Sequence, residues 1–550
     1  MTTAAHNSVP HLCFGRLLNT SWIGVTPPAR IFKMLGSISF VALSLVAATF
    51  ADSQKPLLSD GSYSPQRPCA SVTPPEIDIQ GASILSFSAA EVTDYETSTG
   101  PTVSFCDVNV TLTHNTAGDK VRVQVWLPLD MNDWNERFQA TGGGGFIAGA
   151  FSLMLGPAVA SGYAAASTDA GLSALDGSEL IGDSQLMTNF ASLSLHEMAV
   201  VGKVVTEWFY GKPASYSYWN GCSTGGRQGM MEAQKYPDDF DGILSLAPAI
   251  NWDRFMPMEM YPYVVMTQEG EVVPACVFDA LREYAIAFCD GDDGAEDGVI
   301  SDPQSCKFDA KSAVDKPTNC NDDSYAAISS RQARIYNLIV DGFVTQNGTR
   351  LWYGLMHGTD FSLLIHDPPY MKGWALDFVL EQPDLDPSTM TYAMLEDIFV
   401  KSQEKWNSVI GTDDPDLTAF RDHGGKILTW HGLSDPLIFP EGTLDYWRKV
   451  EANMGGSSAV DDFYRVFSAP GVAHCRGGYG PFPENPMNAL VSWVEDGDAP
   501  DTLPATITTN GVTTERNLCR YPLTQRYLGK GLINKASSWT CTANDGVPLD

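Results

Sequence analysis

The sequence predicts an α/β fold in which a mostly parallel β-sheet is interrupted by one large insertion. Between residues 121 and 247, strand-like segments alternate with segments of helical periodicity, and this order is typical of parallel sheets. The alternation stops at about residue 251 and resumes at about residue 421. A Gly-x-Ser-x-Gly motif at residues 221–225 lies between a predicted strand and a predicted helix, as an exposed nucleophile on such a sheet requires.

The individual elements follow from local periodicity. Residues 121–128 alternate apolar and polar side chains like a half-buried strand. Residues 195–210 repeat apolar side chains at helical spacing. Further strands are expected at 161–169, 216–219, 240–247, 426–430 and 463–467, and a second helix at 228–236. Residues 52–250 and 421–550 together form the predicted catalytic domain, and residues 251–420, rich in Met, Tyr, Trp, Pro and acidic clusters, form an inserted lid domain.

Composition excludes several classes of protein. The chain has 550 residues, of which 44% are hydrophobic and 18% charged, so a large core can form and disorder is not expected. The formal net charge of -32 repels polyphosphates and anionic lipid, which argues against nucleic-acid and membrane-surface partners. No apolar run reaches the length of roughly 18 residues that a transmembrane helix needs.

The N-terminal residues 1–51 have the features of a secretory signal. An apolar run at 35–50 follows Arg30 and Lys33 and ends near Ala51, where small residues suit cleavage. Met34 is an alternative start of the chain, and a buried N-terminal helix is the alternative interpretation.

Cysteine content agrees with secretion. Of eleven cysteines, only Cys13 precedes the predicted cleavage site. The remaining even number predicts a set of disulfides in an oxidising compartment, and no C-x-x-C pair points to zinc or redox chemistry. Asn109 and Asn347 begin glycosylation sequons.

Ser223 is the predicted nucleophile. It is the central residue of the Gly-x-Ser-x-Gly motif, and glycines at 221 and 225 permit the strained turn that exposes its hydroxyl. The amide of Thr224, at the start of the following helix, is expected to donate to an oxyanion. The alternative is a glycine-rich turn in which Ser223 only caps the helix.

An activated serine needs a histidine and a carboxylate, in the order Ser, Asp, His on this class of sheet. Asp435 follows the strand predicted at 426–430, and His474 follows the strand predicted at 463–467. His431 is a rival base, but it lies four residues from Asp435 and is expected to make a local hydrogen bond instead.

Two cysteines flank the predicted catalytic pair. Cys222 precedes Ser223, and Cys475 follows His474. A disulfide between them would hold two Cα atoms roughly 5.5–6 Å apart and so place nucleophile and base side by side. The alternative is that each of these cysteines pairs elsewhere.

Several runs of sequence resemble the tannase and feruloyl esterase family of secreted fungal hydrolases. The runs are Trp219-Asn-Gly-Cys-Ser-Thr-Gly-Gly-Arg-Gln-Gly229, Gln234-Lys-Tyr-Pro-Asp-Asp-Phe-Asp-Gly242, Trp134-Asn-Glu-Arg-Phe138, Ser167-Thr-Asp-Ala-Gly171 and the segment from Cys519 to Cys541. The resemblance, which is to the feruloyl esterase B type, implies an α/β-hydrolase fold with a lid domain. It also implies a triad of Ser223, Asp435 and His474 and a disulfide between Cys222 and Cys475.

The resemblance further implies a structural calcium site in the lid. The matching run is Cys289-Asp-Gly-Asp-Asp-Gly-Ala-Glu-Asp-Gly-Val-Ile300, whose carboxylates are the hard oxygen ligands that calcium prefers. The implied ligands are the side chains of Asp290, Asp293 and Asp297 and the carbonyls of Ala295 and Val299. The alternative is a solvated acidic turn.

The glycine run at 142–145 is expected to complete the oxyanion hole, with the amide of Gly143 as the second donor. The run also fits a loose dinucleotide fingerprint, Gly143-x-Gly145-x-x-Ala148. That interpretation is rejected, because a disulfide-rich secreted protein would rarely meet a nicotinamide cofactor.

The expected function is that of a secreted, calcium-containing serine carboxylic ester hydrolase without an organic cofactor. By resemblance its substrates are phenolic acid esters, with feruloyl and other hydroxycinnamoyl esters of plant cell-wall polysaccharide preferred over the gallate esters of tannins. The alternative of another class is an inactive relative that binds phenolics or glycans.

Overall fold

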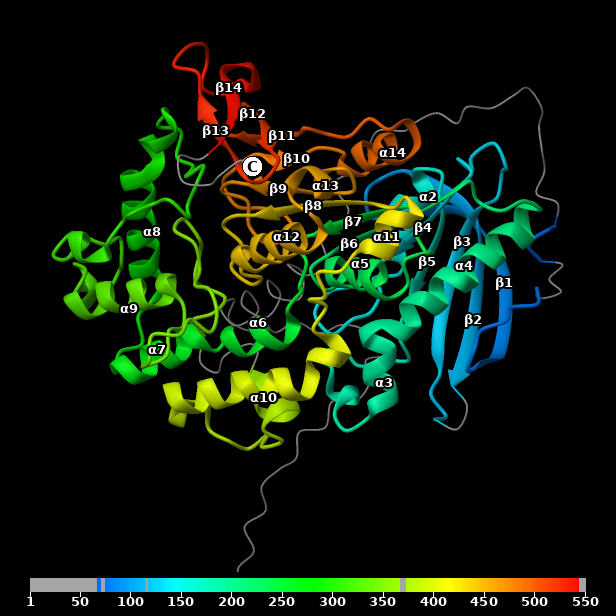
Figure 1. Ribbon diagram of the computed structural model, residues 1–550, viewed down its shortest axis with the longest axis horizontal. Coiled ribbons are helices and arrows are strands. Elements are labelled where there is room, and N and C mark those ends of the chain that lie inside the picture. The colour runs from blue at the N-terminus through cyan, green and yellow to red at the C-terminus, as the bar shows by residue number, and fades with distance from the viewer. Residues whose placement is uncertain (1–66, 71–74, 115–116, 367–371, 544–550) are drawn as a thin grey trace, which may run out of the picture. The chain divides into compact units, whose positions relative to one another are not determined.

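A nine-stranded mixed sheet is the centre of the fold, among the residues that the computed structural model describes (Figure 1). These are residues 67–70, 75–114, 117–366 and 372–543. The predicted signal segment, Met34 and Cys13 lie outside them.

The sheet is antiparallel at one end and parallel through the rest of its strands. The strands are β1 (Ala82–Glu96), β2 (Thr102–His114), β3 (Val121–Pro128), β4 (Arg137–Thr141), β5 (Ala164–Thr168), β6 (Tyr216–Cys222), β7 (Gly242–Leu246), β8 (Lys426–Gly432) and β9 (Tyr464–Ala469), in the order β1-β2-β3-β5-β4-β6-β7-β8-β9. Pairing is antiparallel from β1 to β5 and parallel from β5 through β4, β6, β7 and β8 to β9. The predicted α/β fold is confirmed.

Helices cover both faces of this sheet. Successive residues of each strand point to opposite faces, so neighbouring residues contact different helices. Ile427 packs with the buried residues of α4 (Ser194–Tyr210) and α12 (Pro440–Met454). Its neighbour Leu428 packs with those of α2 (Ser152–Ala160) and α14 (Pro486–Asp496). Two separate cores therefore hold β8, and the predicted catalytic residues that follow it, from both sides.

Helix α5 (Thr224–Lys235) begins four residues before the helix expected at 228–236. Its first turn contains Gly225 and Gly226, residues of low helix propensity, so the helical pattern is recognisable only from its second turn onward. The earlier start places the helix directly after Ser223.

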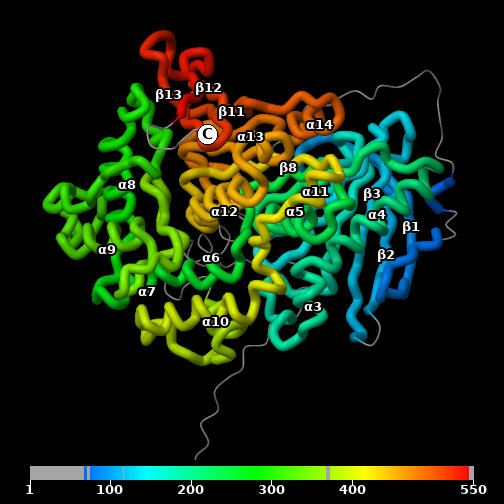
Figure 2. The backbone as a smooth tube through the Cα atoms, in the orientation of Figure 1, coloured from blue at the N-terminus to red at the C-terminus, as the bar shows by residue number. Residues whose placement is uncertain are grey.

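The segment between β7 and β8 is helical. Its helices are α6 (Trp252–Met258), α7 (Tyr261–Glu269), α8 (Ala275–Cys289), α9 (Ser330–Asp341), α10 (Tyr392–Ile410) and α11 (Thr418–His423). They bury their own apolar core, which continues into residues next to the sheet such as Phe190 and Phe439. In Figures 1 and 2, α7 to α10 lie on the side of the molecule opposite β1 and β2. The lid domain boundaries at 251 and 420 remain a prediction.

The last described residues form two small sheets. These are β10 (Phe482–Pro483), β11 (Thr502–Thr509) and β12 (Val512–Cys519) in one, and β13 (Leu523–Tyr527) and β14 (Trp539–Ala543) in the other. The ten cysteines after the predicted cleavage site form five disulfides, namely Cys69–Cys106, Cys222–Cys475, Cys276–Cys320, Cys289–Cys306 and Cys519–Cys541. None of the described helices has the length and apolar character needed to cross a membrane.

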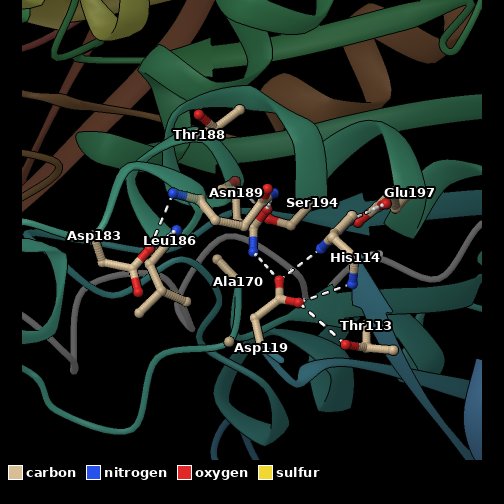
Figure 3. A network of polar contacts seen from close by, with 12 residues as sticks. Thr113, His114, Asp119, Ala170, Asp183, Leu186, Thr188, Asn189, Ser194 and Glu197 are labelled. Carbon is tan, nitrogen blue, oxygen red and sulfur yellow. Dashed lines mark hydrogen bonds and ion pairs between the residues drawn. The ribbon is translucent and has the colours of Figure 1, made fainter. Parts of the chain in front are cut away.

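A buried histidine lies between two carboxylates where β2 meets α4 (Figure 3). His114 Nδ1 is 2.6 Å from Asp119 Oδ2, and His114 Nε2 is 2.6 Å from Glu197 Oε1. Asn189 Nδ2 also donates to Asp119 Oδ2 at 2.7 Å. Burial by itself lowers the pKa of His114, but the hydrogen bonds and charges of the two carboxylates outweigh it and raise the pKa. The imidazolium therefore links two carboxylates that burial would otherwise leave without compensation.

This arrangement predicts a loss of stability as pH rises. The folded-state pKa of His114 is above its unfolded value of about 6.5. Its contribution is therefore complete below about pH 6.5 and is lost as pH rises through the folded-state pKa. Burial also raises the pKa of Glu197, which acts in the same direction. The melting temperature should fall as the pH rises above about 6.5.

The variant His114→Gln tests this assignment. It should cost about 3 kcal/mol at pH 6, the order expected when one partner of a buried ion pair is removed. It should also flatten the decline of the melting temperature above pH 6.5, measured by thermal unfolding across a pH series. An equally steep decline in the variant would show that other groups are responsible.

Candidate active site

Ser223 occupies a strained turn between β6 and α5. Its backbone has φ 64° and ψ -124°, a conformation that costs an ordinary residue on the order of 1–3 kcal/mol. Neighbouring backbone holds it there, since the Ser223 amide donates to Leu246 O at 2.9 Å and the Ser223 carbonyl accepts from the Ala249 amide at 3.1 Å. The side chain of Ser223 in this turn is half-buried.

Glycines make this turn possible. A Cβ atom on Gly221 would lie 2.5 Å from the carbonyl carbon of Gly225, so any side chain at 221 would collide with the first turn of α5. The Gly225 amide donates to Gly143 O at 3.1 Å. The strand, the helix and the glycine run at 142–145 are therefore packed backbone to backbone around Ser223.

Asp435 and His474 are hydrogen bonded. His474 Nδ1 is 2.7 Å from Asp435 Oδ2, and Asp435 Oδ1 accepts from the amides of Leu437 at 2.8 Å and Ile438 at 3.0 Å. Burial by itself raises the pKa of Asp435, but the charges and hydrogen bonds of His474 and His431 hold it well below its usual range. The carboxylate is thus ionised and fixes the orientation of the His474 ring.

His431 bonds to the same carboxylate from a buried position. Its Nε2 is 3.1 Å from Asp435 Oδ2 and 3.1 Å from Ile438 O, and its Nδ1 is 2.8 Å from the Thr443 hydroxyl. The side chain is 1% exposed. Both ring nitrogens have partners, so His431 makes the expected local hydrogen bond and has no nitrogen left to serve as a base.

The disulfide between Cys222 and Cys475 spans this site. Their Cα atoms are 6.0 Å apart, although 253 residues separate them in sequence. Because Ser223 and His474 are the adjacent residues, the bond holds the turn of the serine against the loop of the histidine. The structure therefore brings together Ser223, Asp435 and His474 from the ends of β6, β8 and β9.

Thr224 connects the serine turn to the glycine run. Its amide is at the first position of α5, where the helix offers no carbonyl to accept from it. Its hydroxyl donates to Gly145 O at 2.7 Å. This geometry suits the role of an oxyanion donor that was expected for Thr224.

The prediction that the Gly143 amide is the second oxyanion donor stays a prediction. The Gly143 amide already donates to Gln228 Oε1 at 3.1 Å, and Gln228 Nε2 donates to Ala148 O at 2.9 Å. Gln228 thus holds both ends of the glycine loop from α5. Sequence reasoning missed Gln228. Its place one turn after Thr224 on the same helix indicated that its side chain lies near the serine turn.

The acidic loop at 290–299 brings carboxylates close to one another. Asp290 Oδ2 accepts from the Gly298 amide at 2.9 Å, and Asp293 Oδ2 accepts from the Ser301 hydroxyl at 2.5 Å. Burial, with the charges of Asp297 and Asp290, raises the pKa of Asp293 to about 6. The loop is therefore a set of hard oxygen donors whose charges repel one another, which fits a divalent cation chemically.

Two observations bear on how such an ion would be held. Asp297 forms an ion pair with Arg516 of β12, which already compensates one carboxylate. Within the described residues, no group of three or more His, Cys, Asp or Glu side chains is arranged to hold a metal ion. Calcium ligation by Asp290, Asp293, Asp297, Ala295 and Val299 therefore stays a prediction.

The two sequons differ in accessibility. Asn109 lies within β2, paired with strands on both sides, and its side chain donates to Asp107 Oδ1 at 3.1 Å. Asn347 is exposed in a turn closed by the bond from the Thr345 amide to Thr349 O at 2.8 Å. Asn347 is the more accessible acceptor for a glycan.

Comparison with known proteins identifies the family. The model of the family described as tannase and feruloyl esterase matches residues 106–542, which include the serine turn and both later loops. The chain belongs to this family. Its members are carboxylic ester hydrolases, and the α/β-hydrolase fold expected from the resemblance is confirmed.

Relatives within the tannase and feruloyl esterase family align over most of the chain. A probable feruloyl esterase from Arthroderma benhamiae is 45% identical over 509 residues, which cover 87% of this chain and 94% of the relative. Feruloyl esterase B from Aspergillus niger is 31% identical over 447 residues, covering 76% and 83%.

Solved structures of the family agree with this fold. Tannin acyl hydrolase from Aspergillus niger superposes with a TM-score of 0.78 at 26% identity, covering 86% of this chain and 93% of that one. Feruloyl esterase B from Aspergillus oryzae gives a TM-score of 0.74 at 28% identity, covering 85% and 98%.

Proposed function

We propose that the protein is a secreted serine esterase that hydrolyses feruloyl and related hydroxycinnamoyl esters of plant cell-wall polysaccharide. The observation that carries the catalytic part is the disulfide-flanked pair of Ser223 and His474, with Asp435 bonded to His474 Nδ1 at 2.7 Å. The names of the relatives support the acyl group. Five disulfides support an oxidising, extracellular location.

The proposed mechanism follows from which atoms are already engaged. His474 Nδ1 donates to Asp435, so Nε2 is the nitrogen that accepts the proton as the Ser223 hydroxyl attacks the ester carbonyl. The Thr224 amide donates to the oxyanion that forms. His474 then protonates the leaving alcohol. In the second half of the reaction, His474 Nε2 accepts a proton from water as the water attacks the acyl carbonyl, and it returns the proton to Ser223 Oγ as the acid leaves.

Hydrolysis of gallate esters is the second candidate, because the tannin acyl hydrolase gives the higher TM-score of the two structures compared. Parallel turnover of methyl ferulate, methyl caffeate and methyl gallate decides between them. The feruloyl assignment predicts the highest kcat/KM for methyl ferulate or caffeate. A preference for methyl gallate would make the protein a tannase.

The alternative that the protein is an inactive relative, which only binds phenolics or glycans, is tested by measuring hydrolysis of a chromogenic aryl ester. The strained turn at Ser223 and the ionised Asp435 argue for activity, since strain of this kind persists where it serves a function. Absence of turnover with every ester, in protein that is folded, would contradict the proposed function.

A calcium ion in the acidic loop belongs to the same proposal. Asp290, Asp293 and Asp297 would hold it with the carbonyls of Ala295 and Val299, and its role would be to relieve the repulsion among the carboxylates. Because the unfolded chain lacks the site, bound calcium should raise the melting temperature. No catalytic step depends on it.

The calcium prediction is tested on the full chain. A chelator should lower the melting temperature by several degrees, about what a stability loss of 1–2 kcal/mol produces. Asp293→Ala should melt at the lower temperature with or without chelator. Asp384→Ala, which changes an exposed acid of the same insertion, should still respond to it. Identical melting with and without chelator, and no metal by elemental analysis, would refute the site.

A further inference from the structure

The hydroxyl of Tyr479 joins three separate segments around the catalytic residues. Its Oη donates to Gly358 O at 3.1 Å and lies 3.2 Å from Ser434 Oγ. Because the single phenolic proton is used on Gly358 O, the Ser434 hydroxyl donates to Tyr479. Ser434 precedes Asp435, and Tyr479 is in the loop of His474.

The third segment comes from the insertion between β7 and β8. Gly358 has φ 89°, and a Cβ atom there would lie 2.3 Å from Tyr479 Oη. A side chain at 358 would therefore displace the hydroxyl, and the left-handed backbone favours glycine as well. The inserted segment therefore leaves room for the Tyr479 hydroxyl only when residue 358 is a glycine.

Backbone bonds hold the same loops at their bases. The Tyr479 amide donates to Gly471 O at 2.9 Å, which closes the loop that carries His474, and the Ser434 amide donates to Val472 O at 3.0 Å. The Asp435 and His474 loops are thus tied to each other by backbone. The bond from the Tyr479 hydroxyl to Gly358 O connects these two loops to the inserted segment.

We propose that Tyr479 is a positioning residue of the esterase. It holds the loops of Asp435 and His474 in a fixed position relative to the segment inserted between β7 and β8. The inference rests on the proposed function. Tyr479 touches neither Ser223 nor the reacting atoms in this role. It acts through the loops, so its loss should lower kcat more than it raises KM.

The test compares two Tyr→Phe variants that each remove one hydroxyl donating to a backbone carbonyl. Tyr479→Phe removes the bond to Gly358. Tyr210→Phe removes a bond to Pro128 O at 2.8 Å, in the core between α4 and β3. With methyl ferulate, kcat of Tyr479→Phe should fall roughly fivefold to tenfold, the size expected for one hydrogen bond, with KM changed by less than about twofold.

The Tyr210→Phe control should keep the kcat of the unchanged protein while losing a similar amount of thermal stability. Ser434→Ala supplies a second variant that keeps the phenol. It should lower kcat by less than Tyr479→Phe, and the double variant should be no slower than Tyr479→Phe alone, because the two side chains act through one network.

Three results would overturn the inference. They are an unchanged kcat in Tyr479→Phe, an equal loss of kcat in Tyr210→Phe, and additive losses from Tyr479→Phe and Ser434→Ala. If the unchanged protein hydrolyses no ester, or if Ser223→Ala stays active, the proposed function itself fails and the inference fails with it. An active protein that depends on Ser223 but not on Tyr479 overturns the inference alone.

Discussion

Ser223→Ala should reduce ester hydrolysis by roughly 10⁴-fold to 10⁶-fold, the range seen when a serine nucleophile is removed from a triad. The change deletes one hydroxyl from a turn whose backbone is held by bonds to Leu246 and Ala249. The fold should therefore survive, with an unchanged melting curve. The measurement is kcat/KM for methyl ferulate together with thermal unfolding of the same preparation.

The two histidines on Asp435 provide a matched comparison for the base. His474→Ala should be as inactive as Ser223→Ala, because it removes the group that accepts the serine proton. His431→Ala should retain much of the rate, since Asp435 keeps the amides of Leu437 and Ile438 and its bond to His474. An inactive His431→Ala beside an active His474→Ala would show that the base is assigned to the wrong histidine.

The second large effect is expected from removing the disulfide beside the catalytic pair. The double variant Cys222→Ala with Cys475→Ala leaves no unpaired thiol. The bond spans 253 residues, so its removal should cost about 5 kcal/mol in the chain-entropy model of the unfolded state. Displacement of the base by about 1 Å should cost roughly a hundredfold in rate.

The two effects are separated by measuring turnover well below the melting temperature of the double variant. There the protein is folded, so the loss of rate reports misplacement of His474 and not unfolding. A double variant lacking Cys276 and Cys320, which pair within the insertion, is the control and should keep its rate. Near-normal turnover of the folded Cys222 and Cys475 variant would contradict a positioning role for the bond.

Local sequence determined much of this protein. Strands β3 and β5 to β9 were predictable because a buried strand records its environment in its own apolar residues. Ser223, Asp435 and His474 were predictable because each follows such a strand within a few residues, and chemistry restricts which side chains can act there. The adjacency of Cys222 and Cys475 to two of these residues favoured their pairing, and the family resemblance implied it.

Tertiary structure alone decided the features that depend on residues far apart in sequence. Strand β1 has no fully buried residue, and two irregularities in its pairing with β2 interrupt the alternation of its side chains. The bond of the Gly143 amide to Gln228 could not be foreseen, because its acceptor is 85 residues away. The ion pair of Asp297 with Arg516 spans 219 residues, and the tie between Tyr479 and Gly358 spans 121. Local periodicity reports whether a residue is buried, whereas the partner of a hydrogen-bonding group depends on how the whole chain is folded.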